Sequence, residues 1–195
     1  MTRIQSILAA RLMVAAGLLT LASPAALLAQ AKLSNTATVA LTATLPESLS
    51  ISLDQSAVSF NLVAGGKATG STPVTVTTSW VLQNSRQNVR LTAYFATPTA
   101  ALTNGGTPAV DIPSSEVFGA VGTGSSSWTA FTDGPDAGGV GEAGGSLNLL
   151  TQAISSSNYN SSAQTVLNLE IDLTNQTQLP AGTYTGTLNL QADAL

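Results

Sequence analysis

The last stretch of the chain alternates strictly between apolar and polar side chains over residues 183–194. A turn signal at residues 180–182 precedes it. The apolar face carries Tyr184, Leu188, Leu190, Ala192 and Ala194, with Gly186 among them, and the opposite face is rich in threonine. A period of two is typical of a half-buried strand. A threonine-rich outer face is typical of an antiparallel sheet with one solvated side. The pattern predicts a terminal strand over residues 183–194, which needs an opposing sheet to bury its apolar face.

The same alternation recurs along the chain. It is strongest over residues 73–83, where one face carries Val74, Val76, Thr78, Trp80 and Leu82, so we expect Trp80 in the core. Shorter alternating runs predict strands over residues 49–53, 58–62, 89–95 and 165–173. Residues 147–154 fit either a strand or one helical turn, and residues 84–87 fit a hairpin connection.

No helical periodicity follows residue 31. The sequence therefore predicts an all-β, Ig-like antiparallel β-sandwich with Greek-key connections, in a single domain over residues 32–195. At the head of the last strand we expect Tyr184 to be buried, with its hydroxyl bonded to a nearby backbone group, as in a tyrosine corner.

The N-terminus is typical of an export signal. Arg3 and Arg11 form a positive region before an apolar run over residues 12–28, and residues 29–31 read Ala-Gln-Ala. This order predicts a secretory signal peptide over residues 1–31 that is cleaved after Ala31. A retained membrane anchor is the alternative, but Pro24 and the small residues favour cleavage and leave no membrane span. We therefore expect a secreted protein in the periplasm, at the cell surface or outside the cell.

Charge and composition narrow the function. Only 8% of the residues are charged and 44% are apolar. After residue 31 four basic side chains remain against ten acidic ones, a net charge of −6, so no basic patch for nucleic acid is expected. The chain has no His and no Cys, which excludes a Ser-His-Asp relay and thiolate chemistry. We expect a protein that is not an enzyme and has no cofactor.

A glycine-rich insertion spans residues 104–146 and holds 11 of the 17 glycines. It predicts mobile surface loops with one or two short strands. Within it, Asp133, Asp136 and Glu142 could offer oxygen ligands to calcium, although an acidic solvated loop is the favoured interpretation. Trp128 could stack on a sugar ring or pin the loop to the core.

Two further carboxylates, Glu170 and Asp172, lie two residues apart on one predicted strand. They therefore share a face. A paired-acid glycosidase site would need two such groups across a cleft. A solvated strand face is the favoured interpretation.

Three stretches resemble the spore-coat-U family of secreted, pilin-like domains that chaperone–usher systems assemble. They are residues 38–49, residues 73–80 and the Pro-Ala-Gly-Thr-Tyr run that begins at Pro180. Leu49 stands where the family has a Cys, and the family's second Cys is also missing. The resemblance implies a pilin-like sandwich, a periplasmic chaperone and partner subunits that exchange strands.

The segment over residues 35–45, which we call the N-terminal segment, alternates with Ala37, Val39, Leu41, Ala43 and Leu45 on one face. In pilin-like proteins such a segment is a donor strand that completes the sheet of a neighbouring subunit. It equally fits an ordinary first strand that pairs within its own domain, and we favour this second interpretation.

Three classes of function follow from these observations. The first is a secreted structural or adhesive β-sandwich, such as a self-associating subunit of a surface fibre. The alternative is a secreted module that binds carbohydrate or another ligand. An enzyme is the least expected, because the usual acid–base and nucleophilic side chains are missing.

Overall fold

The computed structural model describes residues 32, 34–124 and 127–195. The expected signal peptide lies outside the described residues. The chain divides into two units, residues 1–42 and residues 43–195. In the first unit the described residues, 32 and 34–42, are exposed and form neither helix nor strand. No described helix is both long and apolar enough to cross a membrane.

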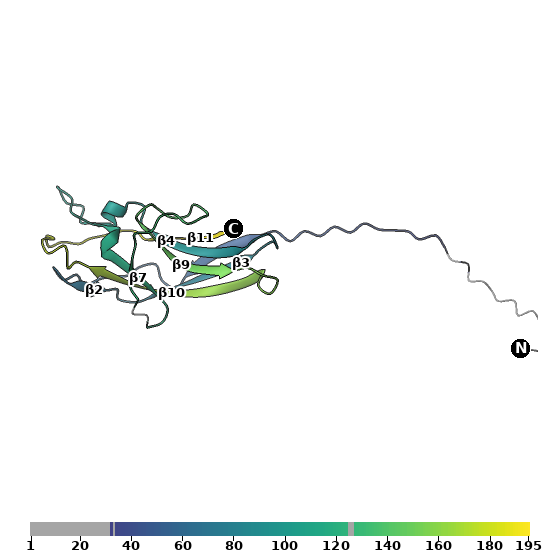
Figure 1. Ribbon diagram of the computed structural model, residues 1–195, viewed down its shortest axis with the longest axis horizontal. Coiled ribbons are helices and arrows are strands. Elements are labelled where there is room, and N and C mark those ends of the chain that lie inside the picture. Colours follow the sequence, from purple (N-terminus) through teal and green to yellow (C-terminus); the bar gives the residue numbers. More distant parts are fainter. Residues whose placement is uncertain (1–31, 33, 125–126) are drawn as a thin grey trace, which may run out of the picture. The chain divides into compact units, whose positions relative to one another are not determined.

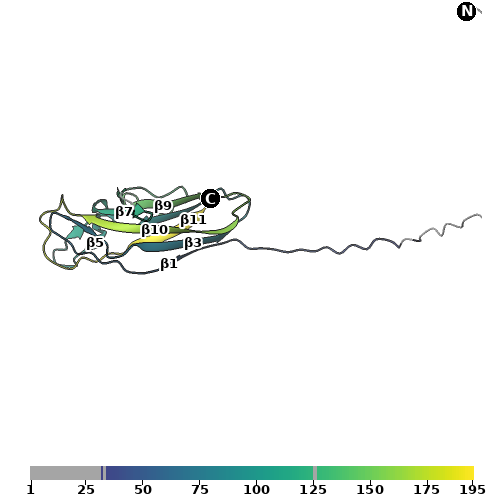
Figure 2. The same cartoon turned by 90° about the horizontal axis from the view of Figure 1, so that it is seen from below.

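The second unit is all-β and its strands pair antiparallel, which confirms the predicted class (Figures 1 and 2). The larger sheet has the order β1 (Ser48–Leu53), β3 (Val74–Val81), β10 (Asn160–Asp172), β7 (Val117–Val121) and β8 (Thr129–Ala130), and β2 (Lys67–Thr69) also pairs with β10. The smaller sheet has the order β11 (Asn189–Ala194), β4 (Asn88–Tyr94) and β9 (Ser146–Ala153). A short pair is formed by β5 (Leu102–Thr103) and β6 (Asp111–Ile112), and two 3₁₀ turns are η1 (Pro98–Ala100) and η2 (Ser114–Glu116).

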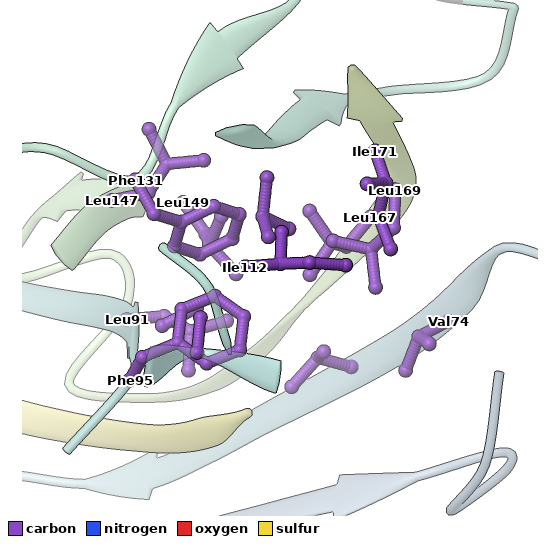
Figure 3. Packing of buried hydrophobic residues seen from close by; sticks show 14 of the residues in the cluster. Val74, Leu91, Phe95, Ile112, Phe131, Leu147, Leu149, Leu167, Leu169 and Ile171 are labelled. Carbon is purple, nitrogen blue, oxygen red and sulfur yellow. The ribbon is translucent and has the colours of Figure 1, made fainter. Parts of the chain in front are cut away.

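Side chains from both sheets meet in one hydrophobic core. Figure 3 shows Leu91 and Phe95 from the β4 side and Leu167, Leu169 and Ile171 from β10. Because successive side chains on a strand point to opposite faces, the alternation read from the sequence decides which ones enter this core. The core lies between the two sheets, as in a sandwich.

The predicted central strand is confirmed as β3, whose residues are alternately buried and half-buried. Trp80 is 3% exposed, as expected for a core residue. Its indole Nε1–H donates a hydrogen bond of 2.8 Å to the carbonyl oxygen of Asn158, which satisfies the one polar atom of the ring.

The hairpin predicted at residues 84–87 is wrong. β3 pairs with β1 and β10, whereas β4 pairs with β9 and β11, so residues 82–87 cross from one sheet to the other. Both strands carry the apolar alternation because both face the core, from opposite sides. A period of two identifies the buried face of a strand, but it does not tell to which sheet the strand belongs.

The glycine-rich insertion is more ordered than the prediction of surface loops. It contributes β6, β7 and β8, and Ile112, Val117 and Phe131 are at most 2% exposed. The Phe131 ring meets Phe95 edge to face, with ring centroids 5.2 Å apart. A Cβ on Gly119 would collide with the side chain of Leu147. Glycine there allows close packing between the sheets rather than flexibility.

Several predicted boundaries also shift. Residues 58–62 do not form a strand, since only Phe60 makes an isolated bridge, to Gly70. β10 begins at Asn160 rather than at residue 165, and residues 147–154 lie mostly in strand β9. The terminal strand begins at Asn189 rather than at residue 183, which leaves residues 183–188 largely unpaired.

Candidate functional site

An open groove lies between residues 53–62, which include the end of β1 and the chain after it, and residues 182–190, which lead into β11. It consists of two adjoining hollows with volumes of about 320 and 620 Å³. Both hollows are lined by Val58, Phe60, Leu102, Ile171 and Gly186. We call the combined depression the groove.

The floor of the groove is apolar because the hydrophobic core reaches the surface there. Val74, Val117 and Leu169 come from the larger sheet, and Phe95 comes from the chain after β4. Residues on the walls pack against the same core but stay only partly buried, among them Val58, Phe60, Leu62, Tyr184, Leu188 and Leu190. The sandwich is therefore incomplete along this side.

The walls also carry unpaired backbone. Gly186, Thr187 and Leu188 make no hydrogen bond to any described residue, and Thr185 makes one bridge, to Thr103. A Cβ on Gly186 would collide with the carbonyl of Ala101, so only glycine lets this wall approach so closely. Free N–H and C=O groups beside an apolar floor are what a further strand could satisfy.

The N-terminal segment does not form the in-domain first strand that we favoured. Residues 35–45 are all exposed and lie in no strand, and the first strand begins at Ser48. Val39, Leu41 and Leu45 are 82%, 91% and 79% exposed. The physical reason lies in the connection, because Pro46 and Glu47 lack the left-handed conformations that a tight hairpin onto β1 would need.

The junction between the segment and β1 is held by an ion pair. The Glu47 carboxylate accepts hydrogen bonds from Arg86 Nη2 at 2.9 Å and from the Gln83 backbone N–H at 2.8 Å. Arg86 Nη1 also donates to the Ala194 carbonyl at 3.1 Å. The hydrogen bond from Arg86 lowers the pKa of Glu47, followed by the one from Gln83. Leu49 and Ala194 pack in one cluster around Trp80, so β1 and β11 meet at this end and separate toward the groove.

Tyr184 has the predicted hydrogen bond but is only half-buried. Its hydroxyl donates to the Pro180 carbonyl at 2.9 Å, and its ring packs against the core. The ring stays partly open because it lines the groove. The expected tyrosine anchor thus holds the chain at the start of one groove wall.

The other candidate ligand sites gain little from the structure. Trp128 is half-buried and lines neither hollow of the groove. Asp133, Asp136 and Glu142 are not brought together: among the described residues no group of three or more acidic side chains could hold a metal ion. Asp136 is instead engaged by protein groups.

That engagement is a cluster that the sequence did not reveal. One Asp136 oxygen accepts the backbone N–H groups of Gly138 and Val140, both at 2.9 Å, and the other accepts the Thr92 hydroxyl at 2.9 Å. Arg90 Nη2 lies 3.6 Å from Asp136 and 2.9 Å from Asp193. The cluster fastens the glycine-rich loop to the outer face of the smaller sheet.

The Glu170 and Asp172 pair does not lie on a freely solvated face. Lys67 Nζ lies 3.3 Å from Glu170 Oε1 and 2.9 Å from Asp172 Oδ2. The hydrogen bond from Lys67, together with two from Thr174, lowers the pKa of Asp172 to about 2. The side chains of Lys67, Glu170 and Asp172 join β2 to the C-terminal end of β10.

Comparisons with known proteins do not assign a role to this site. No protein-family model, no curated protein and no solved structure matches the chain.

One sequence signal could have located the groove: a lone glycine, Gly186, within an alternating strand pattern marks close backbone approach. The walls over residues 53–62 carry no comparable signal.

Proposed function

We propose that the protein is a secreted, non-enzymatic structural subunit that assembles into a surface fibre. The N-terminal segment of one copy inserts as a strand into the groove of the next copy. The observation that carries this proposal is the coexistence of an apolar groove with unpaired walls and an exposed segment whose apolar side chains have strand spacing.

The lengths agree. One wall of the groove follows ten residues, 53–62, and the segment has eleven, 35–45. An extended chain rises about 3.3 Å per residue, so an inserted segment spans roughly 36 Å. That is long enough to run past the ten residues of this wall.

The side chains agree as well. In an inserted strand Val39, Leu41 and Leu45 face the floor, and Thr42 and Thr44 face solvent. Complete burial of each large apolar side chain contributes about 1.5–3 kcal/mol. The floor and wall residues lose their own contact with water in the same step, which adds to the stabilisation.

The backbone supplies the rest of the recognition. Insertion of a strand beside residues 186–188 gives partners to N–H and C=O groups that have none among the described residues. This is strand addition, in which main-chain hydrogen bonds give affinity and alternate side chains give specificity. This mode of binding requires no acid–base or nucleophilic side chain.

Export and assistance belong to the same proposal. The signal-peptide pattern takes the chain out of the cytoplasm, and the pilin-like resemblance implies an Ig-like subunit with Greek-key connections. A periplasmic chaperone would cover the groove until a neighbouring subunit replaces it. The alternative of a carbohydrate-binding module receives less support, because Trp128 lies outside the groove.

The test uses a matched pair of substitutions on the two faces of the segment. The full sequence is expressed in a secreting host, and oligomers are measured on unheated SDS gels and by light scattering. Leu41→Asp should abolish the ladder because it puts a charge on the apolar floor. Thr42→Asp adds the same charge to the solvent face and should leave the ladder.

A peptide experiment separates binding from polymerisation. A labelled peptide with the sequence of residues 32–47 should bind the Leu41→Asp chain, whose own groove is empty. The same peptide carrying Leu41→Asp should not bind. A wild-type chain that stays monomeric at high concentration, with a chaperone and usher present, would end the fibre hypothesis.

A further inference from the structure

We infer that the junction Leu45-Pro46-Glu47 directs the N-terminal segment to a second copy of the chain and away from its own groove. This inference rests on the proposed function. It identifies Pro46 and Glu47 as positioning residues, which act on the choice of partner without entering the groove.

Self-insertion would require a hairpin onto β1. The groove continues from the end of β1, and the segment precedes β1 directly, so the segment would fold back antiparallel to residues 48–58. Two loop lengths keep nearly all of the segment available for pairing. They are a two-residue loop at residues 46–47 and a three-residue loop at residues 45–47.

With the two-residue loop, the apolar face of the segment would not lie on the same side as the inward face of β1. This loop places Leu45 opposite Ser48, and cross-strand partners point to the same face of a sheet. Ser48 is exposed on the outer face of β1, whereas Leu49 and Ile51 pack inward. A shift of one residue moves every side chain to the other face. All five apolar residues of the segment would therefore face solvent.

The three-residue loop restores the phase but has the wrong residues. It sets Ala43 opposite Leu49, with Leu45, Pro46 and Glu47 in the loop. The common form of this loop is a type I turn followed by a left-handed residue. Leu45 would need a helical conformation that a following proline disfavours. Glu47 would need the left-handed region, where non-glycine residues are uncommon.

The side chain of Glu47 adds a second restraint. It is tied to Arg86 and to the backbone of Gln83, and Arg86 is tied to the last residues of β11. A reversal of the chain at residue 47 would have to reorient this carboxylate. Longer loops take further residues out of an eleven-residue segment. The junction thus leaves the groove of another copy as the matching site.

The test converts the junction into a good hairpin. Pro46→Asp with Glu47→Gly gives residues 45–47 the chemistry of a three-residue loop, with glycine at the left-handed position. We expect this chain to be a monomer whose segment pairs with residues 48–57 and fills the near part of its own groove. A tethered segment acts at an effective concentration of about a millimolar, so a labelled peptide with a Kd of about 10 μM for the Leu41→Asp chain should bind about 100-fold more weakly to this variant.

The matched control introduces the same two residues outside the junction. Ser156→Asp with Ser157→Gly changes an exposed turn that lines neither hollow of the groove, so its ladder should equal that of the wild type. Hydrogen exchange guards against misfolding: amides of residues 37–44 should be protected in the monomeric double variant only if the segment pairs with residues 48–55 of its own chain.

The outcomes separate the two proposals. If the wild type forms a ladder and the double variant forms the same one, the junction does not select the partner and this inference is overturned. A monomeric double variant with unprotected residues 37–44 overturns it too, as does a Ser156→Asp, Ser157→Gly chain that stops assembling. If the wild type neither assembles nor leaves a groove that binds peptide, the proposed function itself fails.

Discussion

The glycine-rich insertion and the N-terminal segment differ in how the fold holds them. The insertion, residues 104–146, is fixed by buried side chains, by strand pairing with β10 and by the Asp136 cluster. The segment, residues 35–45, has regular apolar alternation, yet its large side chains are exposed. Hydrophobic side chains stabilise a region only where another surface lies opposite them. In the segment that surface is missing, and in the insertion it comes from both sheets.

The largest expected effect breaks the insertion. Phe131 is fully buried, so Phe131→Ala leaves a cavity between the sheets and should cost about 3–5 kcal/mol of unfolding free energy. Chemical denaturation of the Leu41→Asp chain, which we expect to be monomeric, measures the loss. A cost below about 1 kcal/mol would show that the insertion packs loosely after all.

A smaller effect should follow from the removal of the Asp136 carboxylate. Asp136→Ala leaves the Thr92 hydroxyl and two backbone N–H groups without their acceptor, at a cost of about 2–3 kcal/mol. Limited proteolysis should then cut within residues 133–145 before any other part of the insertion. Asp133→Ala is the control, since that exposed carboxylate has no comparable partners, and it should leave the digestion pattern unchanged.

Acid should distinguish the two regions. Burial raises the pKa of Asp136, but hydrogen bonds from Val140, Thr92 and Gly138 outweigh it and lower the pKa overall. A depressed pKa contributes stability above the unfolded value, near about 3.9, and that contribution is lost as the pH falls below it. Hydrogen-exchange protection factors of residues 136–145 should therefore drop on acidification. Residues 35–45 carry no titratable side chain, so a parallel change there in the monomer would contradict the assignment.

The smallest expected effect concerns the segment itself. Leu41→Ala in a monomeric chain should change the unfolding free energy by less than about 0.5 kcal/mol, because the side chain is 91% exposed. The same substitution in a peptide of residues 32–47 should weaken its binding to the groove. A large loss of stability in the monomer would mean that Leu41 already packs within its own domain.

Local alternation predicted the parts of this fold that depend on one strand at a time. It identified β3 and placed Trp80 in the core, since a strand has only two faces. It could not tell that β3 and β4 belong to different sheets, because that depends on which edges meet. The glycines of the insertion predicted mobile loops, whereas Gly119 allows the two sheets to pack closely.

The candidate site was predicted only in part. The apolar pattern of residues 35–45 was visible, and so was the hydrogen bond of Tyr184 to nearby backbone. The groove was not, because it is a gap between elements that are far apart in the chain. Whether residues 35–45 pair internally depends on the phase and the turn residues at Pro46 and Glu47, which the alternation alone does not reveal.

Each chain has one groove and one segment, and these are different surfaces. Association of this kind is heterologous, so an assembly is directional and has no built-in size. One end always presents an empty groove and the other a free segment, whatever the number of copies between them. A chain that lacks a working segment could add only at the segment-bearing end and would stop growth there. The length of a fibre would then be set by the supply of such terminators and not by the fold of the subunit.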